Sequence, residues 1–137
     1  MSNELIINST PRGSRIALLK NKSLVEFHYE HKGTKFSVGD IYLGVVKKVV
    51  QGLNAAFVDV GYEKDAFLHY LDLGPNIRSL NKFVKEVQSG GVNPPKLSHF
   101  KWEPEIEKLG KIGQVLTKNQ RVLVQVVKEP ISTKGPR

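Results

Sequence analysis

Cysteine is missing from the 137-residue sequence, which excludes a disulfide framework and a thiolate metal site within the chain. A long apolar run is missing as well. No segment approaches the roughly 18 apolar residues of a membrane span, and residues 1–12 lack the apolar stretch of a signal peptide. We therefore expect no membrane span and a cytoplasmic location.

Acidic residues are scarce: the chain has 13 Asp and Glu against 21 Lys and Arg, a formal net charge of +8. The imbalance is greatest from Lys108 to Arg137, where seven basic residues stand against the single acid Glu129. Positive charge favours polyanions, because each neutralised phosphate releases condensed counterions. The charge indicates nucleic acid as a partner, with a merely soluble basic protein as the alternative.

Signals for catalysis are also few. The sequence has no glycine-rich phosphate loop, no evident nucleophile–base pair and no carboxylates at a telling spacing. Asp59, Asp65 and Asp72 are scattered among predicted strand ends and turns. We therefore predict no catalytic residue, metal site or cofactor site within these residues.

Short β-type runs dominate what is present. Three of them open the chain, at residues 4–9, 14–20 and 23–31, separated by tight turns. Apolar residues fall on both faces of the third run. We predict a β-hairpin arm over residues 1–36, and we expect it to pack on a second copy of the chain or on the rest of the molecule, because an isolated ribbon is marginally stable.

Residues 37–137 show a different order of predicted elements. Strand-like runs at 41–50, 53–60 and 66–70 precede a helical stripe between Ile77 and Val87, and a last strand is predicted at 121–128. This order is that of a five-stranded OB barrel. The closing strand would run past Arg137, so we predict a mainly β fold whose barrel is incomplete at that edge, with a helical insert over residues 74–108.

The strand at 53–60 suggests a binding surface. If Ala56 and Val58 face the core, Phe57 faces outward, where an aromatic ring on an OB barrel can stack on a base. A register shifted by one residue would instead bury Phe57. Phe67 and His69 share one face of the next strand and could extend the same patch.

Basic residues near these strands are candidate phosphate contacts. They are Lys48, Lys128, Lys134 and Arg137, and the alternative is a solvated charged face. Lys128 has the strongest case, because it ends the last predicted strand. Phe100 and Trp102 lie in a proline-rich loop, and we interpret them as anchors of that loop in preference to RNA contacts.

Several stretches together resemble one family. They are residues 39–49, 53–61 and 66–69, then 124–130 and 133–137, with residues 4–8 and 15–18 matching the first strands. This pattern is similar to the S1 domain and preceding strands of the bacterial ribonucleases E and G, and it is closer to the G branch. Residues 74–108 depart from the family pattern.

The resemblance implies the N-terminal part of an endoribonuclease of RNA processing and decay. It implies that the arm begins an RNase H-like subdomain, and that Phe57, Phe67 and Lys128 contact single-stranded RNA, joined by His69 and Arg137 from the wider S1 family. Catalytic magnesium and a zinc link would be held by residues further along the chain, so this chain alone should not cleave RNA. An S1 module of a translation or transcription factor and a protein-interaction module remain the alternatives.

Overall fold

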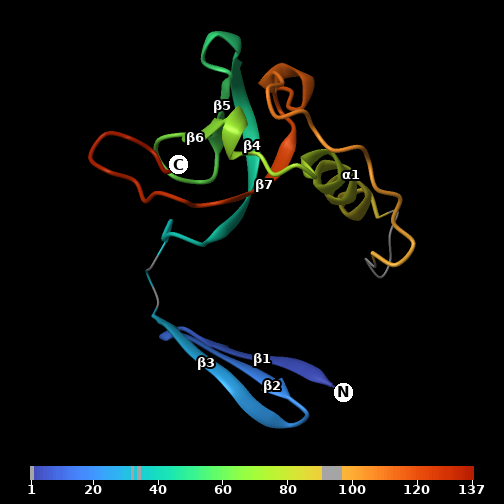
Figure 1. The fold of residues 1–137 in the computed structure, drawn as a ribbon. Coiled ribbons are helices and arrows are strands. Elements are labelled where there is room, and N and C mark those ends of the chain that lie inside the picture. Colours follow the sequence, from blue (N-terminus) through green and yellow to red (C-terminus); the bar gives the residue numbers. More distant parts are fainter. Residues whose placement is uncertain (1, 32, 34, 91–96) are drawn as a thin grey trace. The chain divides into compact units, whose positions relative to one another are not determined.

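The computed structural model describes residues 2–31, 33, 35–90 and 97–137 (Figure 1). Contacts divide the chain into two units, residues 1–35 and residues 36–137. No helix in the described part of the chain is both long enough and apolar enough to cross a membrane.

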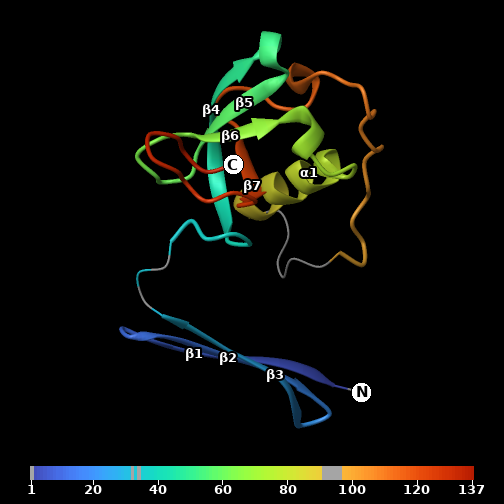
Figure 2. The ribbon, with the colours of Figure 1, turned by 60° about the vertical axis from the view of Figure 1, so that its left-hand side comes forward.

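The first unit is a three-stranded antiparallel sheet, and it contains the predicted arm. Its strands are β1 (Asn3–Thr10), β2 (Gly13–Lys20) and β3 (Ser23–His31), in the order β1-β2-β3 (Figure 2). Asn21 and Lys22 form the tight turn between β2 and β3, both with positive φ. Such a turn matches the twist of the strands that it joins, and the Asn21 side chain accepts a hydrogen bond from the Ser2 amide at 3.0 Å.

No hydrophobic side chain among the described residues of the arm is buried. Leu5 and Ile6 are neighbours on the regularly paired strand β1, so their side chains point to opposite faces, yet they are 63% and 48% exposed. Ile7 on β1 and Phe27 on β3 are also largely exposed. The apolar pattern on both faces is therefore present as predicted, and the surface that covers it stays a prediction.

The second unit is the OB-type barrel. Four strands pair in the antiparallel order β6-β5-β4-β7: β4 (Ile41–Val50), β5 (Ala55–Asp59), β6 (Ala66–His69) and β7 (Arg121–Gln125) (Figure 1). Short 3-10 turns lie at Gln51–Leu53, Tyr70–Asp72 and Ile112–Gln114, and the helix α1 (Ile77–Gln88) follows the second of these. The mainly β fold, the strand order and the helix α1 confirm the predicted fold class.

Two features of β4 curl this sheet. A bulge shifts the pairing with β5 between Val46 and Lys48, and bulges bend a strand and increase its twist. Gly44 lies so close to Val58 that a side chain at position 44 would overlap it. The absence of a side chain there lets β4 bend over β5.

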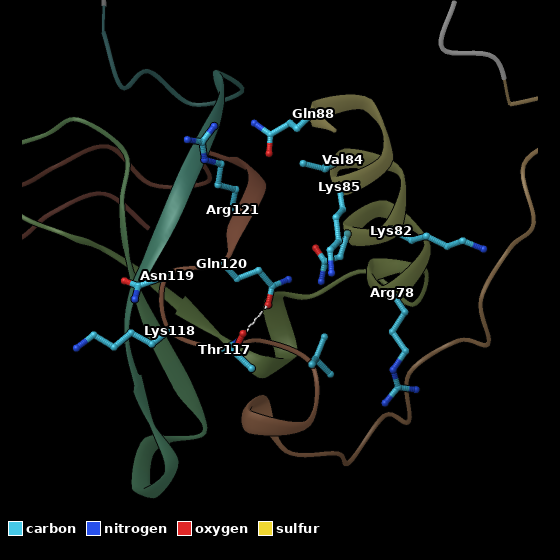
Figure 3. A pocket seen from close by; sticks show the side chains of 12 residues that line it. Arg78, Lys82, Val84, Lys85, Gln88, Thr117, Lys118, Asn119, Gln120 and Arg121 are labelled. Carbon is cyan, nitrogen blue, oxygen red and sulfur yellow. Dashed lines mark hydrogen bonds between the residues drawn. The ribbon is translucent and has the colours of Figure 1, made fainter. Parts of the chain in front are cut away.

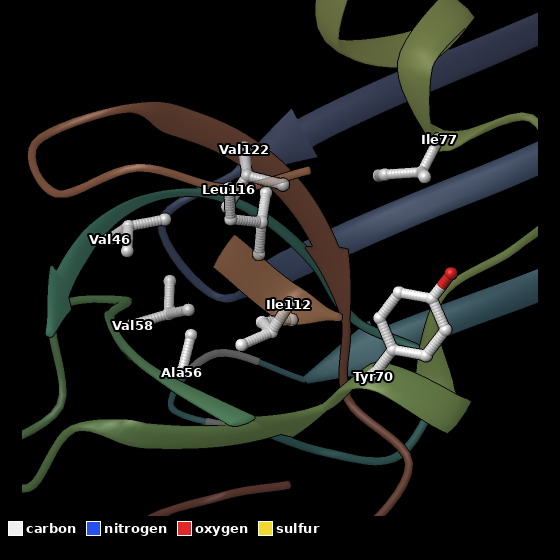
Figure 4. Packing of buried hydrophobic residues seen from close by; sticks show 8 residues of the cluster. All are labelled: Val46, Ala56, Val58, Tyr70, Ile77, Ile112, Leu116 and Val122. Atoms are coloured by element: carbon white, nitrogen blue, oxygen red, sulfur yellow. The ribbon is translucent and has the colours of Figure 1, made fainter. Parts of the chain in front are cut away.

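The core fills the inside of the curl (Figure 4). Its members, all less than 7% exposed, are Val46, Ala56, Val58, Tyr70, Ile77, Ile112, Leu116 and Val122. Ile112 and Leu116 come from residues 109–120, for which the sequence predicted neither a strand nor a helix. Asn54 attaches that segment to the barrel, because its side chain donates to the Gly110 carbonyl at 3.0 Å and accepts from the Ile112 amide at 2.7 Å.

Residues 135–137 occupy the position of the closing strand. The Pro136 carbonyl accepts a hydrogen bond from the Phe67 amide of β6 at 2.9 Å, and Lys128 and Arg137 exchange two backbone hydrogen bonds of 3.0 Å. Gly135 passes against the turn before β6, where a Cβ would overlap the Asp65 carbonyl oxygen. The end of the described chain thus bridges β6 and the continuation of β7, whereas the sequence predicted a closing strand past Arg137 and an open barrel at this edge.

The helical insert packs on the barrel through part of its predicted stripe. Ile77 and Val84 are buried, whereas Leu80 and Val87 are each 37% exposed. Phe83 packs edge-on against Phe100 at 5.6 Å between ring centroids, so Phe100 anchors the loop as predicted, whereas Trp102 contacts Phe100 but stays 62% exposed. Residues 91–96, which belong to the predicted insert over residues 74–108, lie outside the described residues.

Candidate nucleic-acid interface

The outer surface of β4, β5 and β6 carries a row of predicted site residues. Phe57 lies opposite Phe67 on one side and opposite Lys48 on the other, so the three side chains share one face. Ala56 and Val58 are in the core, and Phe57 is half-buried on the outer side. The alternative register, which placed Phe57 in the core, is therefore wrong.

The two phenylalanine rings meet edge to face, with centroids 5.8 Å apart and an interplanar angle of 66°. This is a favourable arrangement for aromatic side chains. Because the rings are steeply inclined to each other, each offers its flat face in a different direction. Each ring could therefore receive a different base.

His69 continues this row beyond Phe67, with ring centroids 6.4 Å apart. Its Nδ1 accepts a hydrogen bond from the Leu71 amide at 3.0 Å, and its own amide donates to Asp72 at 3.1 Å. These two bonds form a capping box where β6 ends in the turn Tyr70–Asp72. The imidazole is thus held in a fixed position, two residues along β6 from Phe67 and on the same face of the strand.

Arg137 lies over the ring of Phe67, with its guanidinium carbon 5.9 Å from the ring centroid. Asp72 orients this guanidinium through two side-chain contacts of 3.3 Å. The pair is partly exposed, since the Arg137 side chain keeps 41% of its surface accessible. A cation held against an aromatic face in this way is placed to meet a phosphate beside a stacked base.

A pocket of about 650 Å³ opens between these elements. Five of the seven predicted RNA-binding residues line it: Phe57, Phe67, Lys128, Lys134 and Arg137. Lys48 and His69 do not line it, but both flank it along the same face. We use the name aromatic face for the row of Lys48, Phe57, Phe67 and His69 together with this pocket.

Sequence reasoning missed two residues at this site. Asp72 was dismissed as a scattered acid, but it joins Arg137 to the His69 backbone. Lys64, in the turn before β6, lines the pocket with the other cations. The spacing of His69 and Asp72 fits a capping box, and this is the one local sequence signal for a role of Asp72. Nothing in the sequence indicates that Asp72 pairs with Arg137, 65 positions later.

The charge of the pocket is mixed and leans positive. Lys64, Lys128, Lys134 and Arg137 line it, against the carboxylates Asp65 and Glu129. Within the described residues, no three His, Asp or Glu side chains gather closely enough to hold a metal ion. The arrangement can therefore stack flat rings and pair with anions.

Comparisons with known proteins give the family. No family model matches the chain. Ribonuclease G of Haemophilus influenzae is 37% identical over 138 residues, which cover 98% of this chain and 23% of that protein. Ribonuclease G of Escherichia coli K12 is 35% identical over 137 residues, which cover 100% of the chain and 24% of that protein.

This chain corresponds to a region of the ribonuclease E/G family proteins. Ribonuclease E of a Nostoc species is 40% identical over 101 residues, covering 73% of the chain and 11% of that protein. The chain thus spans about a quarter or less of the length of these relatives. The ribonuclease G matches include the arm as well as the barrel, so they favour a ribonuclease region over a translation- or transcription-factor module.

Proposed function

We propose that the barrel is an S1-type domain that binds single-stranded RNA for a ribonuclease E/G-type endoribonuclease of RNA processing and decay. The observation that carries the proposal is the gathering of two aromatic rings and three predicted cations around one pocket on the outside of an OB barrel. The family relationship supports RNA as the partner. We also propose that the protein acts in the cytoplasm.

The mechanism is positioning. Bases stack on Phe57 and Phe67, and Lys128, Lys134 and Arg137 meet the phosphates between them. Stacking on an aromatic side chain contributes about 1–3 kcal/mol per base and tolerates any base, because every base has a flat π face. The domain should therefore hold RNA with weak sequence preference, and the cleavage step belongs to residues elsewhere in the full enzyme.

Replacing the rings tests this proposal. Phe57→Ala and Phe67→Ala should each weaken binding of a single-stranded oligoribonucleotide by roughly 5- to 150-fold, which corresponds to the stacking energy of one base. Phe27→Ala is the matched control, because Phe27 is an exposed ring of the arm. Fluorescence anisotropy gives the affinity, and thermal unfolding of the same samples shows that the barrel is intact. Unchanged affinity in both folded variants would contradict the proposal.

The cation contribution is measured separately. Lys128→Ala should reduce the slope of log affinity against log salt by about 0.7, the value for one phosphate contact with a single strand. Lys108→Ala, which removes an exposed charge outside the pocket, should leave the slope unchanged. Duplex RNA should bind more weakly than a single strand, since its bases are not free to stack.

A further inference from the structure

A second hollow lies between α1 and residues 117–121 (Figure 3). Its volume is about 580 Å³, and it shares no lining residue with the pocket of the aromatic face. In Figure 3, Arg121 and Gln88 lie at one end and Arg78 at the other, with Lys85 between them. We call this hollow the helix groove.

Every charged residue that lines the helix groove is basic. Arg78, Lys82, Lys85, Lys118 and Arg121 contribute to it, and no carboxylate does. Only Lys82 is compensated, through an ion pair of 3.2 Å with Glu103. The other four form no ion pair with any residue that the structure describes. Clustered positive charge of this kind attracts an anionic ligand and repels a cationic one.

The remaining lining indicates a phosphate ligand in preference to a base. It contains amide and hydroxyl groups, with Gln120 held by the Thr117 amide at 3.0 Å, and it contains no aromatic ring on which a base could stack. Four of the five cations of the groove have no carboxylate partner among the described residues, so the protein leaves this positive charge for an anion to neutralise.

The groove connects with the aromatic face through the strand register. Arg121 pairs with Val45 on β4, and Val45 pairs with Asp59 on β5. Asp59 lies two residues from Phe57 and therefore on the same outer face. Arg121 is thus two strands from Phe57, roughly 10 Å sideways at about 4.8 Å per strand. OB folds hold roughly 4–16 nucleotides, so a single bound strand can cover both places.

We propose that the helix groove is a second binding site, which takes the phosphodiester backbone of the RNA strand whose bases stack on the aromatic face. This inference rests on the proposed function for the identity of the ligand. Arg121 contacts the RNA phosphate that follows the bases stacked on the aromatic face. Lys85 and Arg78 contact further phosphates along α1. The groove adds affinity without reading bases.

The test compares two double variants of equal charge. Lys85→Gln with Arg121→Gln removes two groove cations, and Lys101→Gln with Lys108→Gln removes two exposed cations that line no described pocket. The probes are a single-stranded oligoribonucleotide, an abasic ribose-phosphate strand of the same length, and poly-glutamate. The groove variant should reduce the salt slope by about 1.4 for both phosphate strands and weaken them about tenfold at low salt, and thermal unfolding confirms its fold.

The outcomes separate the two proposals. If the groove and control variants bind the RNA alike, the groove inference is overturned, whatever Phe57→Ala does. If the groove variant weakens the abasic strand while Phe57→Ala leaves RNA binding unchanged, the groove stands and stacking fails. If poly-glutamate binds as tightly as the abasic strand and loses affinity in the groove variant, the groove is a site for acidic protein segments and the inference is overturned.

Discussion

Residues 3–31 and residues 41–125 both contain antiparallel strands joined by short turns, yet only the second set encloses a core. In the arm, Ile7 is 59% exposed, and in the barrel Ile112 is fully buried. The arm is a sheet with two uncovered faces, whereas the bulge in β4 curls the barrel sheet around one of its own faces. A sheet of this kind is stable only when another layer covers its apolar face.

The largest expected effect comes from the same substitution in the two regions. Ile112→Ala should lower the free energy of unfolding by about 2–5 kcal/mol, because it leaves a cavity in the core. If the arm faces water, Ile7→Ala should change it by less than about 0.5 kcal/mol, as for an exposed position; if the arm packs on another surface as predicted, the loss should be larger. Chemical denaturation measures both.

This pair also reports on what covers the arm. If Ile7→Ala costs as much as a core substitution, another surface buries the arm in solution. A second copy of the chain would then make the melting temperature depend on protein concentration. A monomer with a freely disordered arm would contradict the prediction that the arm packs on something.

Two asparagines with φ of 50° give the next comparison. Asn54 holds the Gly110 carbonyl and the Ile112 amide in a partly buried place, whereas Asn21 holds one exposed amide in the arm. Asn54→Ala should cost about 1–3 kcal/mol, since it leaves a buried donor unsatisfied. Asn21→Ala should lower the free energy of unfolding by less than half of that amount. Equal losses in denaturant titrations would show that backbone conformation, and not the buried bonds, makes Asn54 important.

Glycine substitutions test the closing strand. Gly135→Ala should destabilise the barrel by about 1–3 kcal/mol, because the added methyl group overlaps the Asp65 carbonyl and must push residues 135–137 aside. RNA affinity should fall with it, since Arg137 moves with the strand. Gly52→Ala is the control, because nothing lies within 4 Å of a Cβ there. Full RNA binding by Gly135→Ala would show that this closure is not needed for the aromatic face.

How much of this could be predicted differs between local and distant features. Alternation and turn residues predicted the strands, and helical spacing predicted α1. Alternation determined the face of Phe57 only to within a shift of one residue, which the pairing with Phe67 decides. Ile112 and Leu116 gave no periodic signal, because their burial depends on Asn54, 58 positions before Ile112. Cations at the helix groove come from α1, from β7 and from the turn before β7, and only the fold brings them together.

The smallest expected effect concerns two exposed ion pairs, Asp72 with Arg137 in the barrel and Glu4 with Lys22 in the arm. Exposed pairs contribute about 0–1 kcal/mol, so Asp72→Asn and Glu4→Gln should both leave the melting temperature nearly unchanged. Each removes one negative charge, so their effects on net charge are equal. RNA binding should distinguish them.

Asp72→Asn should bind single-stranded RNA severalfold more tightly, because Arg137 loses its carboxylate partner and becomes free to pair with a phosphate beside Phe67. The asparagine retains a carbonyl oxygen that can accept the hydrogen bond of the His69 amide. Glu4→Gln should change affinity only as much as its unit of net charge does. If the two variants bind alike, the charge of the whole protein, and not the release of Arg137, determines the affinity. Weaker binding by Asp72→Asn would instead mean that RNA needs Arg137 held in its present orientation over the ring.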